Sequence, residues 1–355
     1  MPAKLDWRLF PVAPLLLRKP RVTPALYAHH NDLLRSFAGP ITISPAEAGA
    51  KLSREKHLPR VSICIPAYKP DFFEIALKSA IAQSYTDVEI IVSDDCPTDA
   101  IETVCSRYSG LISYSRNPHP GEYTNIMRLA GLAQGEYIKY LFDDDVLNPF
   151  CVQFLLEALE ATRDRGTKLA FSPRHVIDER NNFINLINHF QVDRGLKIIE
   201  GRDFMRLTAM HHLNLVGEYS TVMMRKADCF DGNGEFRLFR PENGVFRGLL
   251  DLSGWIELAK EGAFVAHPHP LSYFRQHSNS KSNHTTNPIF IYAIIFYEDI
   301  LNYAHANGLL SPQDLPVSYR NLLNVYQYWR AAFPELDARI ARLSALLDDA
   351  GRWSA

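Results

Sequence analysis

Three consecutive aspartates, Asp143, Asp144 and Asp145, directly follow the apolar run YIKYLF (137–142). Adjacent carboxylates repel one another, so this cluster costs free energy unless a cation lies close to it. Mg²⁺ and Mn²⁺ prefer hard oxygen ligands and usually combine one or two protein carboxylates with substrate phosphates. The triplet therefore predicts a divalent-metal site. The alternative is a solvated turn whose aspartates cap the following helix.

A second acidic pair, Asp94 and Asp95, follows the apolar run VEIIVS (88–93). A carboxylate at a strand tip can accept the N3–H of a uracil or bind ribose hydroxyls. Thr98 and Asp99, further along this turn, are expected only to cap the next helix. The sequence contains neither GxGxxG nor GxxxxGK[ST], which argues against a Rossmann dinucleotide site and a P-loop. The pair is a candidate nucleoside contact.

Short apolar strands alternate with helices around these residues. Strands are predicted at 61–66, 88–93, 112–115, 137–142 and 169–173, with helices over 72–84, 98–108, 122–134 and 150–164 between them. This alternation is typical of βαβ crossovers and predicts an α/β fold with a mostly parallel, Rossmann-like sheet flanked by helices. Ligands of such sheets bind outside the carboxyl ends of the strands, where both acidic groups lie.

The regular alternation stops after residue 173. Strands are predicted at 220–225, 263–267 and 271–275, a helix over 249–261, and helices from Pro288 to the end. We therefore divide the chain into three parts. They are a basic N-terminal arm (1–60), an α/β domain (61–285) with halves 61–173 and 174–285, and a C-terminal helical region (286–355).

Composition excludes several classes of protein. The 355 residues include 38 Lys and Arg and 40 Asp and Glu, a balance that argues against a broad nucleic-acid-binding face. Five cysteines without CxxC spacing favour a reducing cytoplasm over a disulfide framework. The chain shows no secretory signal, and no uncharged apolar run reaches the roughly 18 residues of a spanning helix. We expect a soluble, cytoplasmic protein with no nucleic-acid partner.

The first 60 residues are basic, with ten Lys and Arg against four Asp and Glu. Leucines 15–17 lie beside Arg18, Lys19 and Arg21. Such a segment can bind peripherally to the inner face of the cell membrane, each basic residue contributing about 1 kcal/mol. The alternative is an arm packed on the main domain or on a dimer partner. The sequence leaves membrane contact and a homo-oligomer open.

Taken in order, these motifs resemble the family 2 glycosyltransferases of GT-A fold. The matching segments are VSICIPAYKP (61–70), SYTDVEIIVSDDCPTD (84–99), GEYTNIMRLAGLAQGEYIKYLFDDDVLNP (121–149) and LLDLSGWIELAKEGAFVAHPHPLSYFRQHSNS (249–280). The resemblance covers about 61–282. It implies that the half 61–173 binds the nucleotide and that the half 174–285 binds the acceptor.

The resemblance also implies roles for single residues. The DxD element of the family falls on 142–145, with Phe142 at the place of its usual first aspartate. The implied nucleotide-sugar contacts are Pro66, Ala67, Tyr68, Asp94, Asp95, Asn125, Asp143 and Asp144, and the implied ligands of Mn²⁺ or Mg²⁺ are Asp144, Asp145 and His277.

Asp251, at the start of the predicted helix 249–261, is the implied general base. A helix-capping role is its alternative, as a surface histidine is for His277. Two departures from the family pattern are Leu250, where a glutamate is common, and Glu122–Tyr123–Thr124, where many members have an arginine before the asparagine.

The leading hypothesis is an inverting, metal-dependent glycosyltransferase of bacterial surface glycan biosynthesis. Its donor would be a nucleoside-diphosphate sugar, with UDP as the expected nucleotide, and its acceptor a glycan, a lipid-linked molecule or a protein. The alternative is a non-catalytic nucleotide-sugar-binding or scaffold protein, which the apolar Phe142 and Leu250 favour. A nucleotidyltransferase is disfavoured, because the Gly-rich basic loop expected near residue 66 is missing.

Overall fold

The computed structural model describes residues 60–190, 195–238, 248–278, 280, 287 and 289–353. Nearly all of the predicted N-terminal arm, with its membrane contact, lies outside the described residues.

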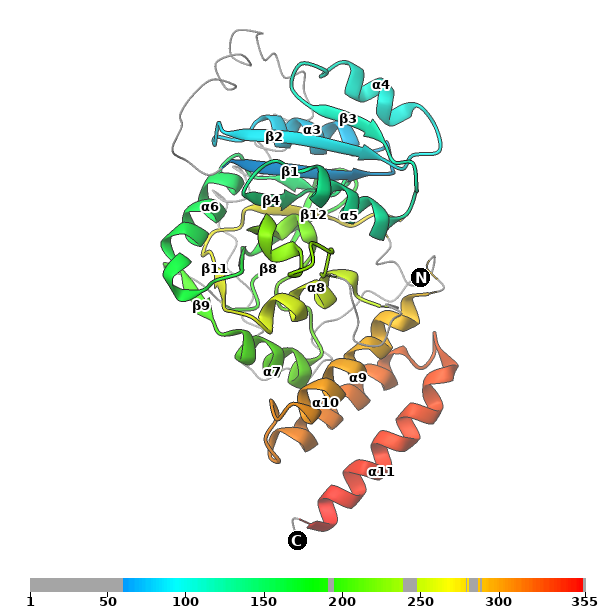
Figure 1. Cartoon of the computed structure of the whole chain (residues 1–355). Helices are drawn as coiled ribbons and strands as arrows, with labels where there is room; N and C mark the ends of the chain where they lie inside the picture. Colours follow the sequence, from blue (N-terminus) through cyan, green and yellow to red (C-terminus); the bar gives the residue numbers. More distant parts are fainter. Residues whose placement is uncertain are drawn as a thin grey trace.

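Apart from a short strand at Val146–Leu147 that the sequence did not predict, the first half of the fold alternates strands and helices as predicted (Figure 1). Most of these strands are short apolar runs, whereas the edge strand at Ser113–Arg116 is polar, and each helix places apolar residues on the face that meets the sheet. In chain order the elements are β1 (Val61–Ala67), α3 (Phe73–Ile81), β2 (Val88–Asp94), α4 (Ala100–Ser106), β3 (Ser113–Arg116), α5 (Glu122–Leu132), β4 (Tyr137–Tyr140), β5 (Val146–Leu147), α6 (Cys151–Ala161) and β6 (Leu169–Phe171).

The second half contains elements that the sequence patterns did not reveal, namely the hairpin β7–β8, strand β9 and helix α7. Its elements are β7 (Arg174–Ile177), β8 (Phe183–Ile187), β9 (Lys197–Ile199), α7 (Gly201–His211), β10 (Val222–Arg225), α8 (Leu250–Ala259), β11 (Phe264–Ala266), β12 (Ser272–Arg275), α9 (Phe290–Ala306), α10 (Asp314–Trp329) and α11 (Asp337–Trp353).

Eight strands form the central sheet, in the order β3-β2-β1-β4-β10-β6-β11-β9. Strands β3, β2, β1 and β4 are parallel, whereas β10 runs antiparallel to β4 and β6. Strand β11 is parallel to β6 and antiparallel to β9. The carboxyl ends of β1, β2 and β4 therefore meet at one edge, which places both acidic groups together.

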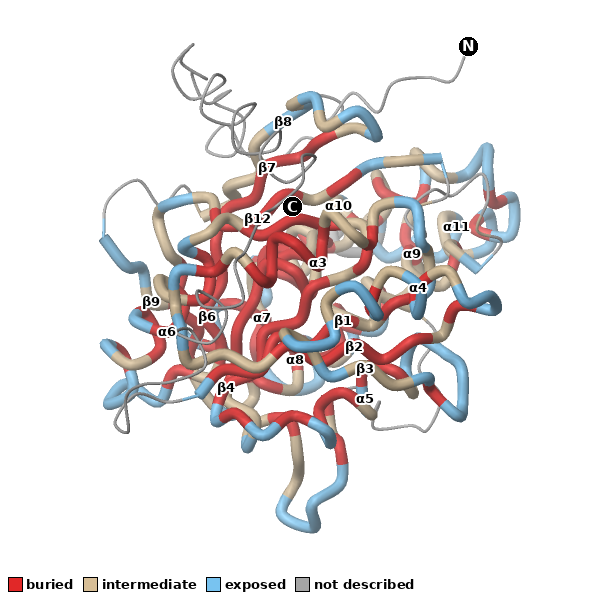
Figure 2. The backbone as a smooth tube through the Cα atoms, turned by 90° about the horizontal axis from the view of Figure 1, so that it is seen from above, coloured by how far each residue is buried: buried red, intermediate tan, exposed pale blue. Residues whose placement is uncertain are grey.

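Helices cover both faces of this sheet, which confirms the predicted fold class. Side chains of α3, α4 and α6 pack on one face, and those of α5, α7 and α8 pack on the other. Figure 2 shows the buried backbone concentrated in the central strands and the exposed backbone in the surrounding turns.

A second sheet, β5-β12-β7-β8, adjoins the acidic turn. The pairing of Tyr273 with Val146 and of Ser272 with Leu147 fixes the register of β12 against β5. This register brings the end of β12 beside the residues that precede β5. The tract 275–278 therefore lies next to the three aspartates.

Helices α9, α10 and α11 lie at the opposite end of the molecule from β2 and β3 (Figure 1). They are the helices predicted after Pro288. Ile300 and Leu301 of α9 and Leu322 of α10 are buried in the same core as Trp255 of α8. The helical region thus shares its core with the α/β part, and the division into domains stays a prediction. Within the described residues no helix is both long enough and apolar enough to cross a membrane.

Candidate active site

Asp143 holds the turn that follows β1. Its Oδ2 atom accepts hydrogen bonds from the backbone N–H groups of Tyr68 and Lys69, each at 2.6 Å. Burial and the neighbouring charge of Asp144 raise the pKa of Asp143 to about 6. Asp143 thereby fixes the backbone of Tyr68, a residue that is 54% exposed.

Asp145 points into the protein, where it is 1% exposed. Its Oδ1 atom accepts the backbone N–H of Arg275 at 3.0 Å, and its carboxyl also bonds the side chain of Ser220. Burial, with the charge of Asp144, raises the pKa of Asp145 well above its usual range. Below it, the buried Lys139 donates to the carbonyl oxygens of Ser220 and Tyr140, and burial lowers the pKa of Lys139 to about 8.

Asp144 and His277 come together from two different loops. The Nε2 atom of His277 lies 3.0 Å from Oδ2 of Asp144. Of the three predicted metal ligands, the structure brings these two together, whereas Asp145 is engaged elsewhere. No group of three His, Cys, Asp or Glu side chains suited to a metal ion occurs within the described residues.

This pair nevertheless fits a divalent cation. A carboxylate oxygen and an imidazole nitrogen are both ordinary ligands of Mn²⁺-type ions, and two protein ligands suffice when substrate phosphates complete the coordination. A cation here would also offset the charge that raises the pKa of Asp143 and Asp145.

Asp94 makes structural contacts at the end of β2, and its place among the nucleotide contacts stays a prediction. Its side chain is 0% exposed and accepts hydrogen bonds from the backbone N–H of Cys96 and the hydroxyl of Tyr114. Arg116 lies 3.6 Å away. These contacts occupy both carboxylate oxygens and fix the turn after β2.

Asp95, in contrast, retains a free acceptor. Its backbone N–H donates to the carbonyl oxygen of Ala67, which joins this turn to the Pro66–Ala67–Tyr68 segment. Its Oδ2 atom accepts the N–H of Gly121, whereas Oδ1 is buried and has no hydrogen-bond partner in the described part of the chain.

Asn125 lies beneath the same turn. Its Nδ2 atom donates to the carbonyl oxygen of Ser93 at 3.0 Å, and its Oδ1 atom has no partner among the residues that the structure describes. The side chain is only 2% exposed, so Asn125 anchors α5 to the end of β2.

Asp251 is the second residue of α8 and is partly buried. Its Oδ2 atom accepts Nδ2 of Asn214 at 2.7 Å, and its Oδ1 atom accepts the backbone N–H of Leu252 at 2.7 Å. Burial raises the pKa of Asp251 to about 7, and the charges of Glu218 and Glu122 act in the same direction. A carboxyl group with this pKa can exchange a proton near neutral pH.

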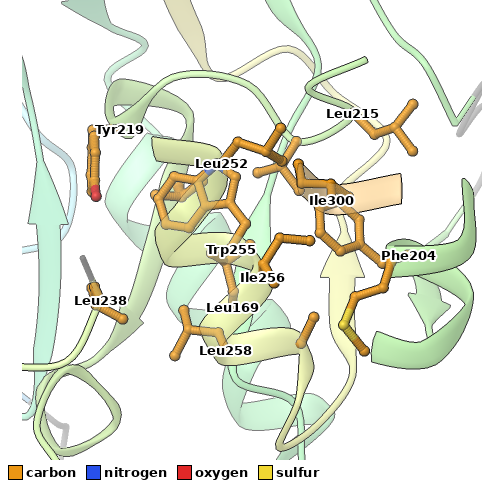
Figure 3. Close-up of a cluster of buried hydrophobic side chains, with 14 of the residues drawn as sticks. Leu169, Phe204, Leu215, Tyr219, Leu238, Leu252, Trp255, Ile256, Leu258 and Ile300 are labelled. Carbon is orange, nitrogen blue, oxygen red and sulfur yellow. The ribbon is translucent and has the colours of Figure 1, made fainter. Parts of the chain in front are cut away.

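Helix α8 is fixed by its buried face. Trp255 is 0% exposed and packs between Tyr219 and the side chains of α7 and α9 (Figure 3). Its Nε1 atom donates to the carbonyl oxygen of Gly217 at 2.9 Å. Asp251 is therefore carried by an anchored helix, which is a suitable support for a group that must meet its substrate with a fixed geometry.

Sequence reasoning missed several residues around these groups. Arg174 and Glu218 form an ion pair at 2.5 Å beside Asp251, and Arg275 contacts the backbone of Asp144. Arg275 lies two residues before His277, in a tract that the sequence analysis selected for its histidine. This proximity was a signal that could have identified Arg275. The role of Asn214 carried no such signal, because the residue lies in a loop without a pattern.

Comparison with known proteins matches a large part of the segments described above. Residues 62–240 match the family model described as glycosyl transferase family 2. Asp251 and His277 lie beyond the matched range.

Two relatives align with this chain over different shares of their length. An uncharacterized protein of Mycobacterium tuberculosis is 27% identical over 240 residues, which cover 65% of this chain and 72% of that protein. The succinoglycan biosynthesis protein ExoO of Rhizobium meliloti is 28% identical over 142 residues, 39% of each chain. Among solved structures, Staphylococcus aureus TarS in complex with UDP-GlcNAc aligns with a TM-score of 0.44 and 14% identity, over 76% of this chain and 81% of that one.

Proposed function

Because the chain belongs to glycosyl transferase family 2, we propose that this glycosyltransferase moves a sugar from a nucleoside-diphosphate sugar to an acceptor hydroxyl, with inversion at the anomeric carbon. The observation that carries the proposal is the partly buried carboxyl of Asp251, whose pKa of about 7 suits a general base.

We propose UDP as the nucleotide of the donor. The free Oδ1 acceptor of Asp95 suits the N3–H donor of uracil. The exposed ring of Tyr68 lies on the connected turn and offers a face on which a base can stack. Asp143 supports this site by holding the backbone of Tyr68 and Lys69.

Asp144 and His277 would hold a divalent cation, Mn²⁺ or Mg²⁺. When bound, the cation supplies positive charge that stabilises the leaving diphosphate. The chain's own contribution is to hold the two ligands 3.0 Å apart on the ends of two different segments. The mixed carboxylate and imidazole set favours Mn²⁺, since Mg²⁺ prefers oxygen ligands.

In the proposed step, the acceptor oxygen attacks the anomeric carbon from the face opposite the diphosphate. The new carbon–oxygen bond forms as the bond to the diphosphate oxygen breaks, and UDP leaves with that electron pair. Asp251 takes the proton of the acceptor hydroxyl and later releases it to solvent. Asn214 and the N–H of Leu252 keep the carboxyl oriented for this transfer.

The biological context is also a proposal. The relative ExoO is named for succinoglycan biosynthesis, which supports a role in bacterial surface polysaccharide synthesis. The acceptor would then be a glycan, a lipid-linked molecule or a protein. A cytoplasmic location, with the basic N-terminal arm at the membrane, would suit such an acceptor.

Release of UDP from donor sugars tests this function. The protein should hydrolyse a UDP-sugar slowly without acceptor, and faster transfer should appear with the right acceptor. Nucleoside diphosphates that bind should also raise the melting temperature, because ligands specific to the folded state stabilise it. Binding of UDP-sugars without any turnover across donors and acceptors would favour the alternative, a non-catalytic nucleotide-sugar-binding protein.

A further inference from the structure

The guanidinium group of Arg275 is completely buried beside the acidic turn. Its Nε atom donates to the carbonyl oxygen of Asp144 at 2.8 Å. Its Nη1 atom donates to the carbonyl oxygen of Asp178 at 3.0 Å and to Oδ1 of Asn181 at 2.7 Å. One side chain thereby joins the acidic turn to the turn between β7 and β8.

This arrangement is unusual for a buried cation. The carboxylates of Asp145, Asp144 and Asp178 act on the guanidinium through their charge and not through a side-chain hydrogen bond, and Nη2 is buried without a hydrogen-bond partner among the described residues. A buried charge without a direct partner is costly. The negative charges of Asp145, Asp144 and Asp178 offset part of that cost, although burial still lowers the pKa of Arg275. An apolar side chain would fill the same space at a lower cost in free energy. The contacts of Arg275 therefore point to a role in holding the two turns in a fixed arrangement.

The backbone of Arg275 strengthens the same link. Its N–H donates to Oδ1 of Asp145, while its side chain holds the carbonyl of Asp144. His277, two residues further on, reaches Oδ2 of Asp144. The ring of Phe72 packs against both, 4.4 Å from the guanidinium carbon of Arg275 and 5.4 Å from the ring of His277, measured to ring centroids.

The β7–β8 turn is itself firmly built. Oδ1 of Asp178 accepts the backbone N–H groups of Arg180 and Asn182. Asn181 adopts a left-handed conformation with φ 65°, which directs a tight turn. Glu179 accepts the N–H of Ser278, so the turn makes a second contact with the segment around His277.

We infer that Arg275 is a positioning residue that, with Asn181, sets the distance and orientation between Asp144 and His277. The inference rests on the proposed function, because it concerns the pair that would hold the cation. It assigns a role in donor binding to the β7–β8 hairpin, which contributes no side chain to that pair.

The test compares Arg275→Met, Arg275→Lys and Asn181→Gly. Glycine tolerates the left-handed conformation at 181, so Asn181→Gly removes the side-chain acceptor of Nη1 and leaves its bond to the carbonyl oxygen of Asp178, while keeping the turn. Arg225→Met is the matched control, because Arg225 also donates to two carbonyl oxygens and lies over an aromatic ring, that of Tyr137, away from the acidic turn. For each variant, titration calorimetry gives the affinity for UDP with Mn²⁺ and with EDTA, and Mn²⁺ electron paramagnetic resonance gives metal occupancy.

We expect Arg275→Met and Asn181→Gly to weaken Mn²⁺ binding in the presence of UDP at least tenfold, with UDP affinity in EDTA unchanged. The Mn²⁺ affinity of Arg275→Lys should lie between those of these variants and the wild type, because lysine restores the charge without the planar set of N–H donors of the guanidinium. Arg225→Met should retain wild-type Mn²⁺ affinity. Wild-type Mn²⁺ affinity in folded Asn181→Gly and Arg275→Met would overturn the inference and leave the proposed function intact. If wild type itself binds UDP independently of Mn²⁺, the metal part of the proposed function fails first and the inference fails with it.

Discussion

Asn214 donates a hydrogen bond from Nδ2 to Oδ2 of Asp251 at 2.7 Å. The amide is fixed in turn by Gly217, whose N–H donates to Oδ1 of Asn214 at 3.0 Å. Gly217 also accepts the indole N–H of Trp255, from the same helix as Asp251. The orientation of the carboxyl is therefore tied to the core shown in Figure 3 rather than to a mobile surface contact.

Asp251→Asn should lose at least about a hundredfold in transfer rate, because the amide cannot accept the acceptor's proton. Donor affinity should stay at the wild-type value. The measurement is initial transfer rate at saturating donor, together with calorimetric UDP affinity. Near-wild-type transfer would remove Asp251 from the mechanism and leave it a helix-terminal residue.

The same variant should alter the pH dependence of stability. The pKa of Asp251 is raised to about 7 in the folded protein, so the wild type loses stability as the pH rises from about 4 through 7. Asp251→Asn removes this loss and should melt at an equal or higher temperature at pH 8. A clearly lower melting temperature at pH 8 would show that the ionised carboxylate stabilises the fold.

The pH profile of kcat/KM should rise through an acid limb near pH 7 as Asp251 loses its proton. Glu218→Gln removes a negative charge that raises this pKa and leaves Arg174 unpaired, so the limb should move to lower pH. Glu257→Gln is the control, since Glu257 lies on the same helix and pairs with Lys260. An unmoved limb in Glu218→Gln, or a limb that persists in Asp251→Asn, would assign the titration to another group.

Asp143→Ala should weaken UDP binding about tenfold or more, because it removes both hydrogen bonds to the backbone of Tyr68 and Lys69. Asp143→Asn should remain close to wild type, since one amide oxygen can accept both N–H groups. Calorimetry in EDTA separates this effect from metal binding. Equal UDP affinity in wild type and the alanine variant would show that the turn holds its shape without Asp143.

Asp94 and Asp95 should respond in opposite ways to alanine. Asp94→Ala should lower the free energy of unfolding by about 2–4 kcal/mol, because it leaves the buried N–H of Cys96 and the partly buried hydroxyl of Tyr114 without a partner. Asp95→Ala should cost less stability and weaken UDP binding about tenfold. Urea unfolding and calorimetry measure the two effects. A larger loss of UDP affinity in Asp94→Ala at equal stability would reverse the assignment.

The sequence predicted the sheet of the first half well because most strands there are short apolar runs bounded by turn residues. The β7–β8 hairpin was missed because residues 174–187 mix charged, polar and apolar side chains without an alternating period. Its partly exposed strand β8 buries too little to impose one. The sequence consequently did not predict the contact between Arg275 and Asn181.

The apolar residues that depart from the family pattern have a structural explanation. Phe142 stacks on Tyr219 with ring centroids 5.7 Å apart, and Tyr219 packs against Trp255 at 4.9 Å. Leu250 packs on the same core. Both side chains thus help to anchor the acidic turn and helix α8. Phe142 and Trp255 are 113 residues apart in the sequence. Their place in one core depends on tertiary packing, which a local sequence pattern does not reveal.

Mn²⁺-dependent binding of UDP, measured by calorimetry in wild type and Asp144→Ala, tests the central claim most directly. The account predicts that Mn²⁺ raises wild-type affinity for UDP at least tenfold over EDTA, and that Asp144→Ala abolishes this gain. The variant should keep or slightly gain stability without ligand, because it relieves the repulsion that raises the pKa of Asp143 and Asp145. Equal Mn²⁺ dependence in the two proteins, or UDP binding indifferent to Mn²⁺ in wild type, would contradict the account.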